Sequence, residues 1–347
     1  MSSPFKFLDA YEKKDRDIYF GREKETEQLY EKLFETNLLL LYGASGTGKS
    51  SLINCGLCNR FQAEDWFSLF VRREENIMDS LWRHIEQKSL TPISEGMNVP
   101  EAIRSLYLDH YKPIYLIFDQ FEEIFIEGKT EEQYQFFHTL QEILTANLQC
   151  KVILSMREEY LGHLYDFENI IPQLYEHRFR VERMKKDALE RVISGTLKAF
   201  GIEVIDPDTT ISAILNNLRD KKKGIDLTNL QVYLDRLHRN DLQLIEQEGF
   251  ERPVRFDPKL VGDTALEDVL TDFLDEQLTL IETELGEGYA GVPLDILLTL
   301  VTDDGTKKAI DTQVLTELVQ RKHKITATEV DACLQRFEQI RILNLSS

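Results

Sequence analysis

One eight-residue segment constrains the fold of this chain more than any other feature. It reads GASGTGKS, spans Gly43 to Ser50 and directly follows an apolar run, Leu38–Tyr42. The spacing matches the phosphate-binding pattern G-x-x-x-x-G-K-[ST] without a mismatch. In that pattern a buried strand ends in a glycine-rich turn, and backbone N–H groups at the start of the next helix surround phosphate oxygens. The segment therefore predicts a strand–loop–helix unit that binds a nucleoside triphosphate.

The polar side chains of this segment have distinct expected roles. Lys49 would reach the β- and γ-phosphates, and the Ser50 hydroxyl would bind Mg²⁺. The other nucleotide contacts expected here are Ala44, Ser45, Gly46, Thr47, Gly48 and Ser51. A glycine-rich turn without a ligand is the alternative. The strand before the segment and the helix start after it (SSLINCGL) disfavour that alternative.

A second buried run supplies the acidic partner that such a site needs for Mg²⁺. Apolar Ile114–Phe118 is followed by Asp119, whose carboxylate oxygens suit a hard cation and its water shell. Glu122 and Glu123 follow three and four residues on; either could orient or deprotonate the attacking water, or both could be solvated residues of a helix start. Gln120 occupies the position where many P-loop ATPases carry a catalytic Glu, so we expect slow hydrolysis.

A later apolar run predicts a sensor of the γ-phosphate. Lys151–Met156 is followed by Arg157, and a strand next to the P-loop strand would place this guanidinium near the γ-phosphate. A charge-assisted bond to that phosphate exists in only one nucleotide state. The alternative is a surface arginine paired with Glu158.

The order of apolar and amphipathic segments predicts an α/β fold. Five apolar runs alternate with helical patterns, which indicates a P-loop NTPase parallel sheet with helices on both faces. The expected strands are Leu38–Tyr42, Trp66–Arg72, Ile114–Asp119, Lys151–Met156 and Arg178–Val181. After about Arg183 we expect no further strands until the end of the chain.

Three domains are expected along the chain. Residues 1–183 would form the nucleotide-binding domain, including an N-terminal adenine-pocket segment, and residues 184–250 an all-α lid. Residues 251–347 show three helices followed by a strand-like end, Ile342–Ser347, a pattern typical of a winged helix that is cut off before its wing closes. We therefore expect a fragment of a longer protein.

The composition of the chain limits the partners and the cellular location that we expect. The net charge is −20, and an acidic surface repels phosphate backbones, so nucleic acid is not an expected partner. No apolar run reaches the roughly 20 residues that a membrane span needs, and the N-terminus lacks a signal-peptide core. Four cysteines are too few for a disulfide framework in 347 residues. These features favour the cytoplasm.

Four segments together resemble the STAND family of signal-transduction ATPases, and most closely its bacterial novel STAND group. Pro4–Tyr11 is similar to the opening Pro-φ-x-φ-Leu-x-x-Tyr segment, where φ is an apolar residue, and Phe20–Glu23 reads Phe-Gly-Arg-Glu. Asp119–Glu123 reads Asp-Gln-Phe-Glu-Glu, and Arg157–Leu161 matches Arg-Glu-x-Tyr-Leu. The resemblance covers essentially the whole chain and is strongest over residues 4–165.

The resemblance implies a switch. In this family ADP holds a closed form, and exchange for ATP opens the protein, which self-associates and controls an effector or sensor domain that here would lie outside these residues. Phe20, Gly21 and Arg22 would line the adenine pocket. The lid position where the family usually carries a proline is Leu227. ATP or ADP with Mg²⁺ is thus the implied ligand.

A second kind of function is an AAA-type ATPase that acts on DNA through its winged helix. Residues 251–347 contain ten Lys and Arg against nineteen Asp and Glu, the reverse of what a DNA reader needs. A GTPase is disfavoured because no [NT]-K-x-D segment occurs. The expected sensor Arg157 and the helical C-terminal half argue against a small-molecule kinase.

Overall fold

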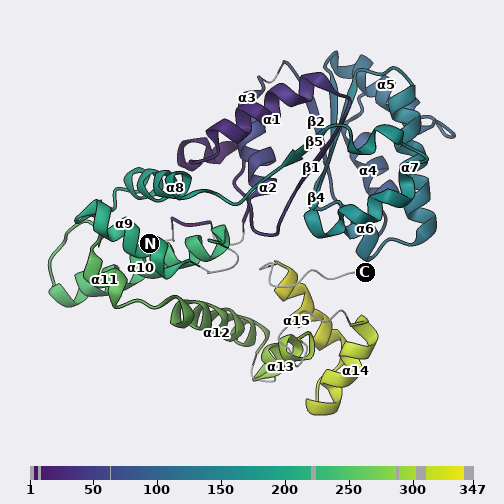
Figure 1. Ribbon diagram of the computed structural model, residues 1–347. Coiled ribbons are helices and arrows are strands. Elements are labelled where there is room, and N and C mark those ends of the chain that lie inside the picture. Colours follow the sequence, from purple (N-terminus) through teal and green to yellow (C-terminus); the bar gives the residue numbers. More distant parts are fainter. Residues whose placement is uncertain are drawn as a thin grey trace.

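The computed structural model describes residues 4–6, 9–62, 64–219, 224–286, 289–301 and 310–339. Its centre is a five-stranded parallel sheet of order β2-β3-β4-β1-β5 (Figure 1). The strands are β1 (Leu38–Gly43), β2 (Phe67–Val71), β3 (Ile114–Phe118), β4 (Cys150–Arg157) and β5 (Arg178–Arg180). All five predicted strands are confirmed, and β4 is the neighbour of the P-loop strand β1.

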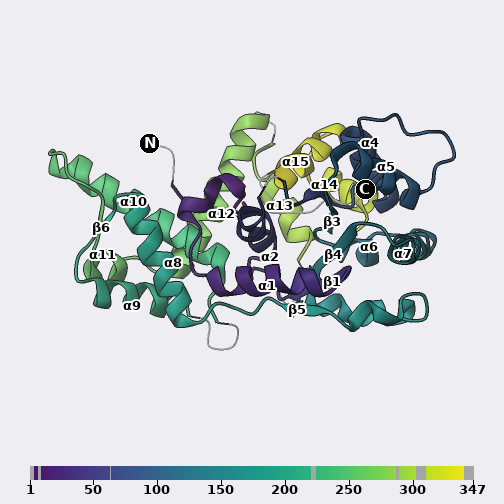
Figure 2. The same cartoon turned by 90° about the horizontal axis from the view of Figure 1, so that it is seen from above.

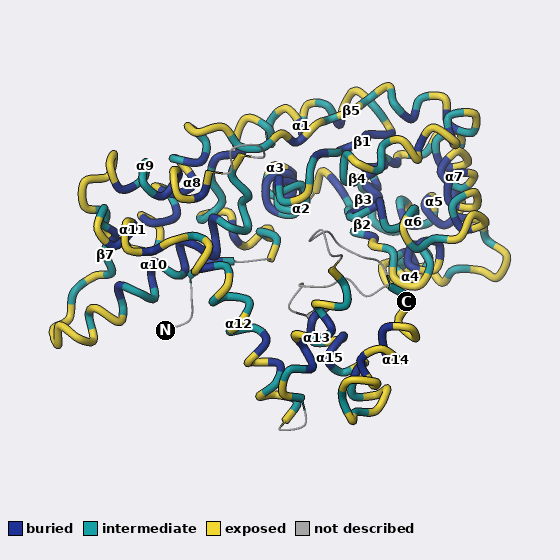
Figure 3. Tube along the Cα trace, turned by 60° about the horizontal axis from the view of Figure 1, so that its bottom comes forward, coloured by how far each residue is buried: buried dark blue, intermediate teal, exposed yellow. Residues whose placement is uncertain are grey.

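Both faces of the sheet are covered because the strands are apolar on both sides. Figure 3 shows β1 coloured as buried. Leu38 to Leu41 of this strand are all buried, and alternate residues join different cores. One core packs the sheet against α4 (Ile77–Lys88), α5 (Val99–His110) and α7 (Thr130–Thr145). The other packs it against α1 (Glu23–Glu35) and the P-loop helix. Near-continuous hydrophobic runs are typical of such parallel strands.

The helix after the P-loop changes its winding within three turns. It begins as α2 (Lys49–Ser51), becomes the π-helical segment η2 (Leu52–Leu57) and ends as α3 (Cys58–Arg60). A π-helical turn is rare and is often found at functional sites. The remaining short helices of this part are η1 (Lys13–Ile18), α6 (Glu123–Ile126), η3 (Glu158–Phe167) and η4 (Pro172–Tyr175).

A helical unit follows the sheet and has its own core (Figure 2). It contains α8 (Lys186–Ala199), α9 (Pro207–Asn217), α10 (Leu227–Glu248) and α11 (Pro258–Gly262). The prediction that strands stop after Arg183 is wrong for two short segments, since β6 (Glu203–Val204) pairs in parallel with β7 (Arg255–Phe256). Strands of two residues are too short to leave a periodic pattern in the sequence.

The last part is a bundle of α12 (Leu266–Leu285), α13 (Val292–Thr299), α14 (Thr312–Lys322) and α15 (Ala327–Gln339). Helix α12 joins two cores, because Val269 packs with the lid whereas Leu278 and Ile281 pack with α13–α15. Figure 1 shows α12 running from the lid helices to this bundle. The strand-like end Ile342–Ser347 lies outside the described residues.

Candidate nucleotide-binding site

The P-loop leaves the end of β1 and turns directly into α2. Gly46 and Gly48 have φ angles of 72° and 84°, in the left-handed region that a side chain disfavours. Gly43 ends the strand beside Val181, and an added Cβ would lie 2.4 Å from the Val181 carbonyl oxygen. Glycine at these positions is therefore required by backbone geometry as well as by access to phosphate.

Lys49 is held over its own loop. Its Nζ donates hydrogen bonds to the carbonyl oxygens of Gly43 (2.9 Å) and Ala44 (3.1 Å). Burial lowers the pKa of this ammonium, and the nearby Glu122 carboxylate opposes that shift. The side chain thus lies along the loop where phosphates would bind, with carbonyl oxygens as its partners.

Asp119 lies at the carboxyl end of β3, is 5% exposed and is bonded on both carboxylate oxygens. Oδ1 accepts from the Ser50 hydroxyl (3.0 Å) and from the Ser155 hydroxyl of β4 (3.2 Å). Oδ2 pairs with the Arg72 guanidinium at 2.6 Å. The structure therefore brings together Ser50 and Asp119, the two predicted Mg²⁺ ligands.

Ser155 and Arg72 are contacts that the sequence analysis missed. Both lie at the carboxyl edge of the sheet, on strands that flank β3: Ser155 in β4, and Arg72 directly after β2. Val71 pairs with Phe118, so the next residue of each strand lies at the same edge. Each of these residues is a polar residue near the end of an apolar run. Such a residue predicts a contact with Asp119 only when the order of the strands in the sheet is known.

The donors present fit Mg²⁺. The cation favours oxygen ligands and usually keeps several waters together with substrate phosphates. A hydroxyl and a carboxylate oxygen 3.0 Å apart, at the start of the P-loop helix, supply the protein share of such a shell. The described residues contain no group of three or more His, Cys, Asp or Glu side chains suited to a metal. The site thus has oxygen ligands for a cation that binds together with nucleotide.

Glu122 and Arg157 form a closed pair beside the P-loop. Arg157 Nε lies 3.0 Å from Glu122 Oε1, and the Arg157 backbone N–H donates to Glu122 Oε2 at 3.1 Å. The alternative pairing of Arg157 with Glu158 is wrong, since Glu158 pairs with Arg180 across the end of β5. Burial raises the pKa of Glu122, and the Arg157 charge opposes that shift.

Glu123 follows in the first turn of α6. Burial raises its pKa to about 7, and the neighbouring carboxylates Glu127 and Glu122 add to the rise. Gln120, three residues earlier, has a φ of 58°, which is unusual for a residue with a side chain. The next N–H, that of Phe121, donates to the Ser155 carbonyl at 2.8 Å and fixes this turn against β4. The acids Asp119, Glu122 and Glu123 are therefore presented by one tight turn.

The Phe-Gly-Arg-Glu segment packs on helix α8. A Cβ at Gly195 would lie 2.7 Å from the Phe20 ring, and a Cβ at Gly21 would lie 2.8 Å from the Ala188 carbonyl oxygen. Arg22 is 2% exposed; its Nη2 donates to the carbonyl oxygens of Thr47 (2.8 Å) and Glu182 (2.7 Å). Arg22 thus ties the P-loop backbone to the chain that enters the lid.

The expected adenine contacts are therefore placed at the junction of α8 and the P-loop. Contact of the base with Phe20, Gly21 or Arg22 stays a prediction. For Arg22 these hydrogen bonds give a different role, support of the loop, because its Nη atoms face protein acceptors, the Glu25 carboxylate among them.

The lid reaches the P-loop through the start of α10. A Cβ at Gly48 would lie 3.3 Å from Leu227 Cδ1, so Leu227 contacts the loop from the expected lid position. A Cβ at Gly46 would lie 2.2 Å from Asp226 Oδ2. Asp226 caps α10 by accepting from the Thr228 N–H at 2.8 Å. The sequence analysis missed this carboxylate, which lies against the loop that should receive phosphates.

Comparison with known families decides the class of this protein. A family model described as Novel STAND NTPase 1 matches residues 4–347. The chain belongs to this family. A comparison with curated proteins finds no match. Among the described residues of this novel STAND NTPase, no helix is both long and apolar enough to cross a membrane.

Two solved structures are similar to this chain over most of its length. The ORC2 protein of Aeropyrum pernix, solved in ADPNP–ADP complexes, is 13% identical, with a TM-score of 0.51 over 93% of this chain and 95% of that one. A Walker-type ATPase of Pyrococcus abyssi is 17% identical, with a TM-score of 0.49 over 97% and 93%. The likeness to ORC2 is one of fold, and membership of an NTPase family implies that the chain binds nucleotide.

Proposed function

We propose that this novel STAND NTPase module is a regulatory switch that binds ADP or ATP with Mg²⁺ and hydrolyses ATP slowly. ADP would hold the closed arrangement. ATP would open it, promote self-association in the cytoplasm and control an effector or sensor domain attached outside these residues. Lys49, Ser50 and Asp119 would contact the phosphates and the cation, with Leu227 and the loop backbone closing over them.

One observation carries this proposal: the Asp226 carboxylate lies against the P-loop glycine Gly46. Arg183 lies 4.0 Å from this carboxylate and compensates its charge only in part, so a carboxylate at that place still repels the phosphates that the loop is built to bind. Nucleotide binding and the observed lid position are therefore in competition. Because Asp226 begins α10, a change at the phosphates is transmitted to the lid and, through α12, to the C-terminal bundle.

The Glu122–Arg157 pair supports a distinction between ATP and ADP. Arg157 is about one-third exposed and, within the part of the chain that the structure describes, pairs with one carboxylate, that of Glu122, so its guanidinium can turn toward an added anion. Release from Arg157 would leave Glu122 free to orient water, and Glu123, with a pKa of about 7, is the second candidate for that role. The cation itself would contribute charge neutralisation at the β- and γ-phosphates.

Action on DNA is less well supported. The likeness to ORC2, at 13% identity, extends to the fold alone. Residues 251–347, with nineteen acidic against ten basic side chains, would present a repulsive surface to a duplex. A packing role for the C-terminal bundle fits this charge better.

The experiment that tests the switch compares Asp226→Asn with wild type by calorimetric titration of ADP and ATP. Asparagine still caps a helix, so α10 keeps its first turn, but the negative charge at the P-loop is gone. We expect both nucleotides to bind about tenfold more tightly to the variant. Asp311→Asn, at the cap of α14, is the matched control and should leave both affinities unchanged. Equal affinities for wild type and Asp226→Asn would contradict competition between lid and phosphate.

A further inference from the structure

Arg72 occupies an unusual place for a positive charge. Its Nη2 lies 2.6 Å from Oδ2 of Asp119, the acid expected to serve Mg²⁺. The Asp119 side chain is only 6% exposed, whereas that of Arg72 is 43% exposed. Without Arg72 the carboxylate would be buried with two hydroxyl donors and, among the described residues, only the more distant charge of Lys49. The guanidinium thus supplies the positive charge that a cation would otherwise bring.

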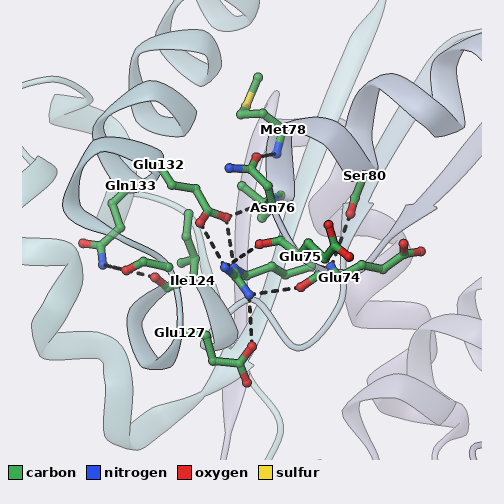
Figure 4. A network of polar contacts seen from close by, with 12 residues as sticks. Glu74, Glu75, Asn76, Met78, Ser80, Ile124, Glu127, Glu132 and Gln133 are labelled. Carbon is green, nitrogen blue, oxygen red and sulfur yellow. Dashed lines mark hydrogen bonds and ion pairs between the residues drawn. The ribbon is translucent and has the colours of Figure 1, made fainter. Parts of the chain in front are cut away.

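The backbone that carries Arg72 is held firmly by the next residue. Arg73 is 5% exposed and forms a two-pronged ion pair with Glu132 and a third contact with Glu127, each at 3.0 Å. It also donates to the carbonyl oxygens of Glu74 and Glu75 in its own loop. Figure 4 shows these loop residues, Glu127 and Glu132 gathered into one network. If the partners of Asp119 change, the Arg72 side chain therefore moves, whereas the loop backbone stays in place.

A cavity next to Arg72 leaves space for its side chain to rotate away from Asp119. A cavity of about 760 Å³ lies along the free edge strand β2 and is lined by both Arg72 and Asp119. Trp66 and Phe70 line its apolar part, and Glu74, whose carboxylate pairs with the exposed Arg83, is also among the lining residues. A guanidinium that leaves Asp119 can thus turn within this space toward another acid without moving β2.

We infer that Arg72 is an exchangeable counter-ion for Asp119. A divalent cation displaces Arg72 from this carboxylate only when nucleotide phosphates help to bind that cation. Two positive charges cannot share one carboxylate favourably, so Arg72 weakens binding of a bare cation. Phosphate oxygens add ligands and negative charge, and the balance then favours the metal. Arg72 is therefore a positioning residue that makes metal uptake depend on nucleotide. This inference rests on the proposed nucleotide site.

The test uses Mn²⁺ as a spectroscopic stand-in for Mg²⁺, with free Mn²⁺ followed by electron paramagnetic resonance in the nucleotide-free full chain. Arg72→Gln should bind Mn²⁺ at least about tenfold more tightly than wild type. Arg72→Lys keeps the charge and should stay within about twofold of wild type. Arg60→Gln, which removes an exposed arginine whose partner is Glu27, controls for net charge and should also match wild type.

A second variant tests where the Mn²⁺ ion binds. Adding Ser50→Ala to Arg72→Gln should abolish the tenfold gain, because the gained Mn²⁺ would lie between Ser50 and Asp119. An Arg72→Gln variant that binds Mn²⁺ no better than wild type, or a gain that survives Ser50→Ala, would overturn the inference. Failure of the proposed nucleotide site looks different, since wild type would then show no rise in Mn²⁺ affinity on addition of ADP.

Discussion

Replacement of Arg73 by methionine should destabilise the nucleotide-binding domain far more than an ordinary surface substitution. The guanidinium is 5% exposed and holds two carboxylates, Glu132 at 6% and Glu127 at 13% exposure. Methionine has a similar length but no charge, so the buried Glu132 would lose the counter-ion that the described residues give it, and Glu127 would lose its contact with Arg73. Glu132 would keep a single hydrogen bond from this region, the one it accepts from the Ile77 N–H at 2.8 Å.

The magnitude follows from this burial. Removal of one partner from a buried ion pair costs about 3–5 kcal/mol, because the remaining charge is left uncompensated. An exposed pair contributes only about 0–1 kcal/mol. The same loop offers that comparison: Arg83 pairs with Glu74, and both side chains are about half exposed (47% and 53%). Arg83→Met should therefore cost less than about 1 kcal/mol.

Urea unfolding followed by circular dichroism measures both variants. The reasoning also predicts a rescue, since Glu132→Gln removes the stranded charge while its amide oxygen can still accept from Ile77. The double variant Arg73→Met/Glu132→Gln should be more stable than Arg73→Met alone. If Arg73→Met costs no more than Arg83→Met, or the second substitution adds a further loss, the assignment of a stabilising buried network is refuted.

Three further outcomes are expected. Lys49→Ala should abolish ATP and ADP binding in calorimetry, and retained micromolar affinity would contradict the P-loop assignment. Arg157→Ala should leave ADP affinity within about twofold but weaken the response to ATP; an equal loss of both would remove its sensor role. Protonated Glu123 stabilises the fold fully below pH 4.5, and this contribution is lost as pH rises through about 7. The free energy of unfolding of wild type, measured relative to Glu123→Gln, should therefore fall from pH 5 to pH 8 by up to about 3 kcal/mol, whereas a constant difference would count against a raised Glu123 pKa.

The sheet and the phosphate loop could be predicted from the sequence because each is a local pattern. Leu38–Leu41 and Ile114–Phe118 are uninterrupted apolar runs, and the residues after them carry the site chemistry. Parallel strands align their carboxyl ends, so Ser50 and Asp119 were expected to meet, and their side chains lie 3.0 Å apart. Local sequence patterns were thus sufficient to predict the phosphate loop and the position of Asp119 beside it.

Contacts between distant segments could not be predicted in the same way. Arg72 meets Asp119 only because β2 pairs with β3, and Asp226 meets Gly46 only because the lid folds back on the loop. Neither residue belongs to a motif. Arg22 shows the converse, since it was assigned from a motif, yet its guanidinium lies buried against the carbonyls of Thr47 and Glu182. Such contacts depend on tertiary packing that spacing along the chain does not encode.

In the proposed switch, nucleotide identity controls the assembly of this novel STAND NTPase module. The most direct measurement denatures the purified chain to identify any released nucleotide, then follows molar mass by light scattering with ADP and with a non-hydrolysable ATP analogue. We expect bound ADP on a monomer that assembles when the analogue replaces the ADP, as the proposed switch requires. A chain without nucleotide that hydrolyses ATP steadily at constant mass would contradict it.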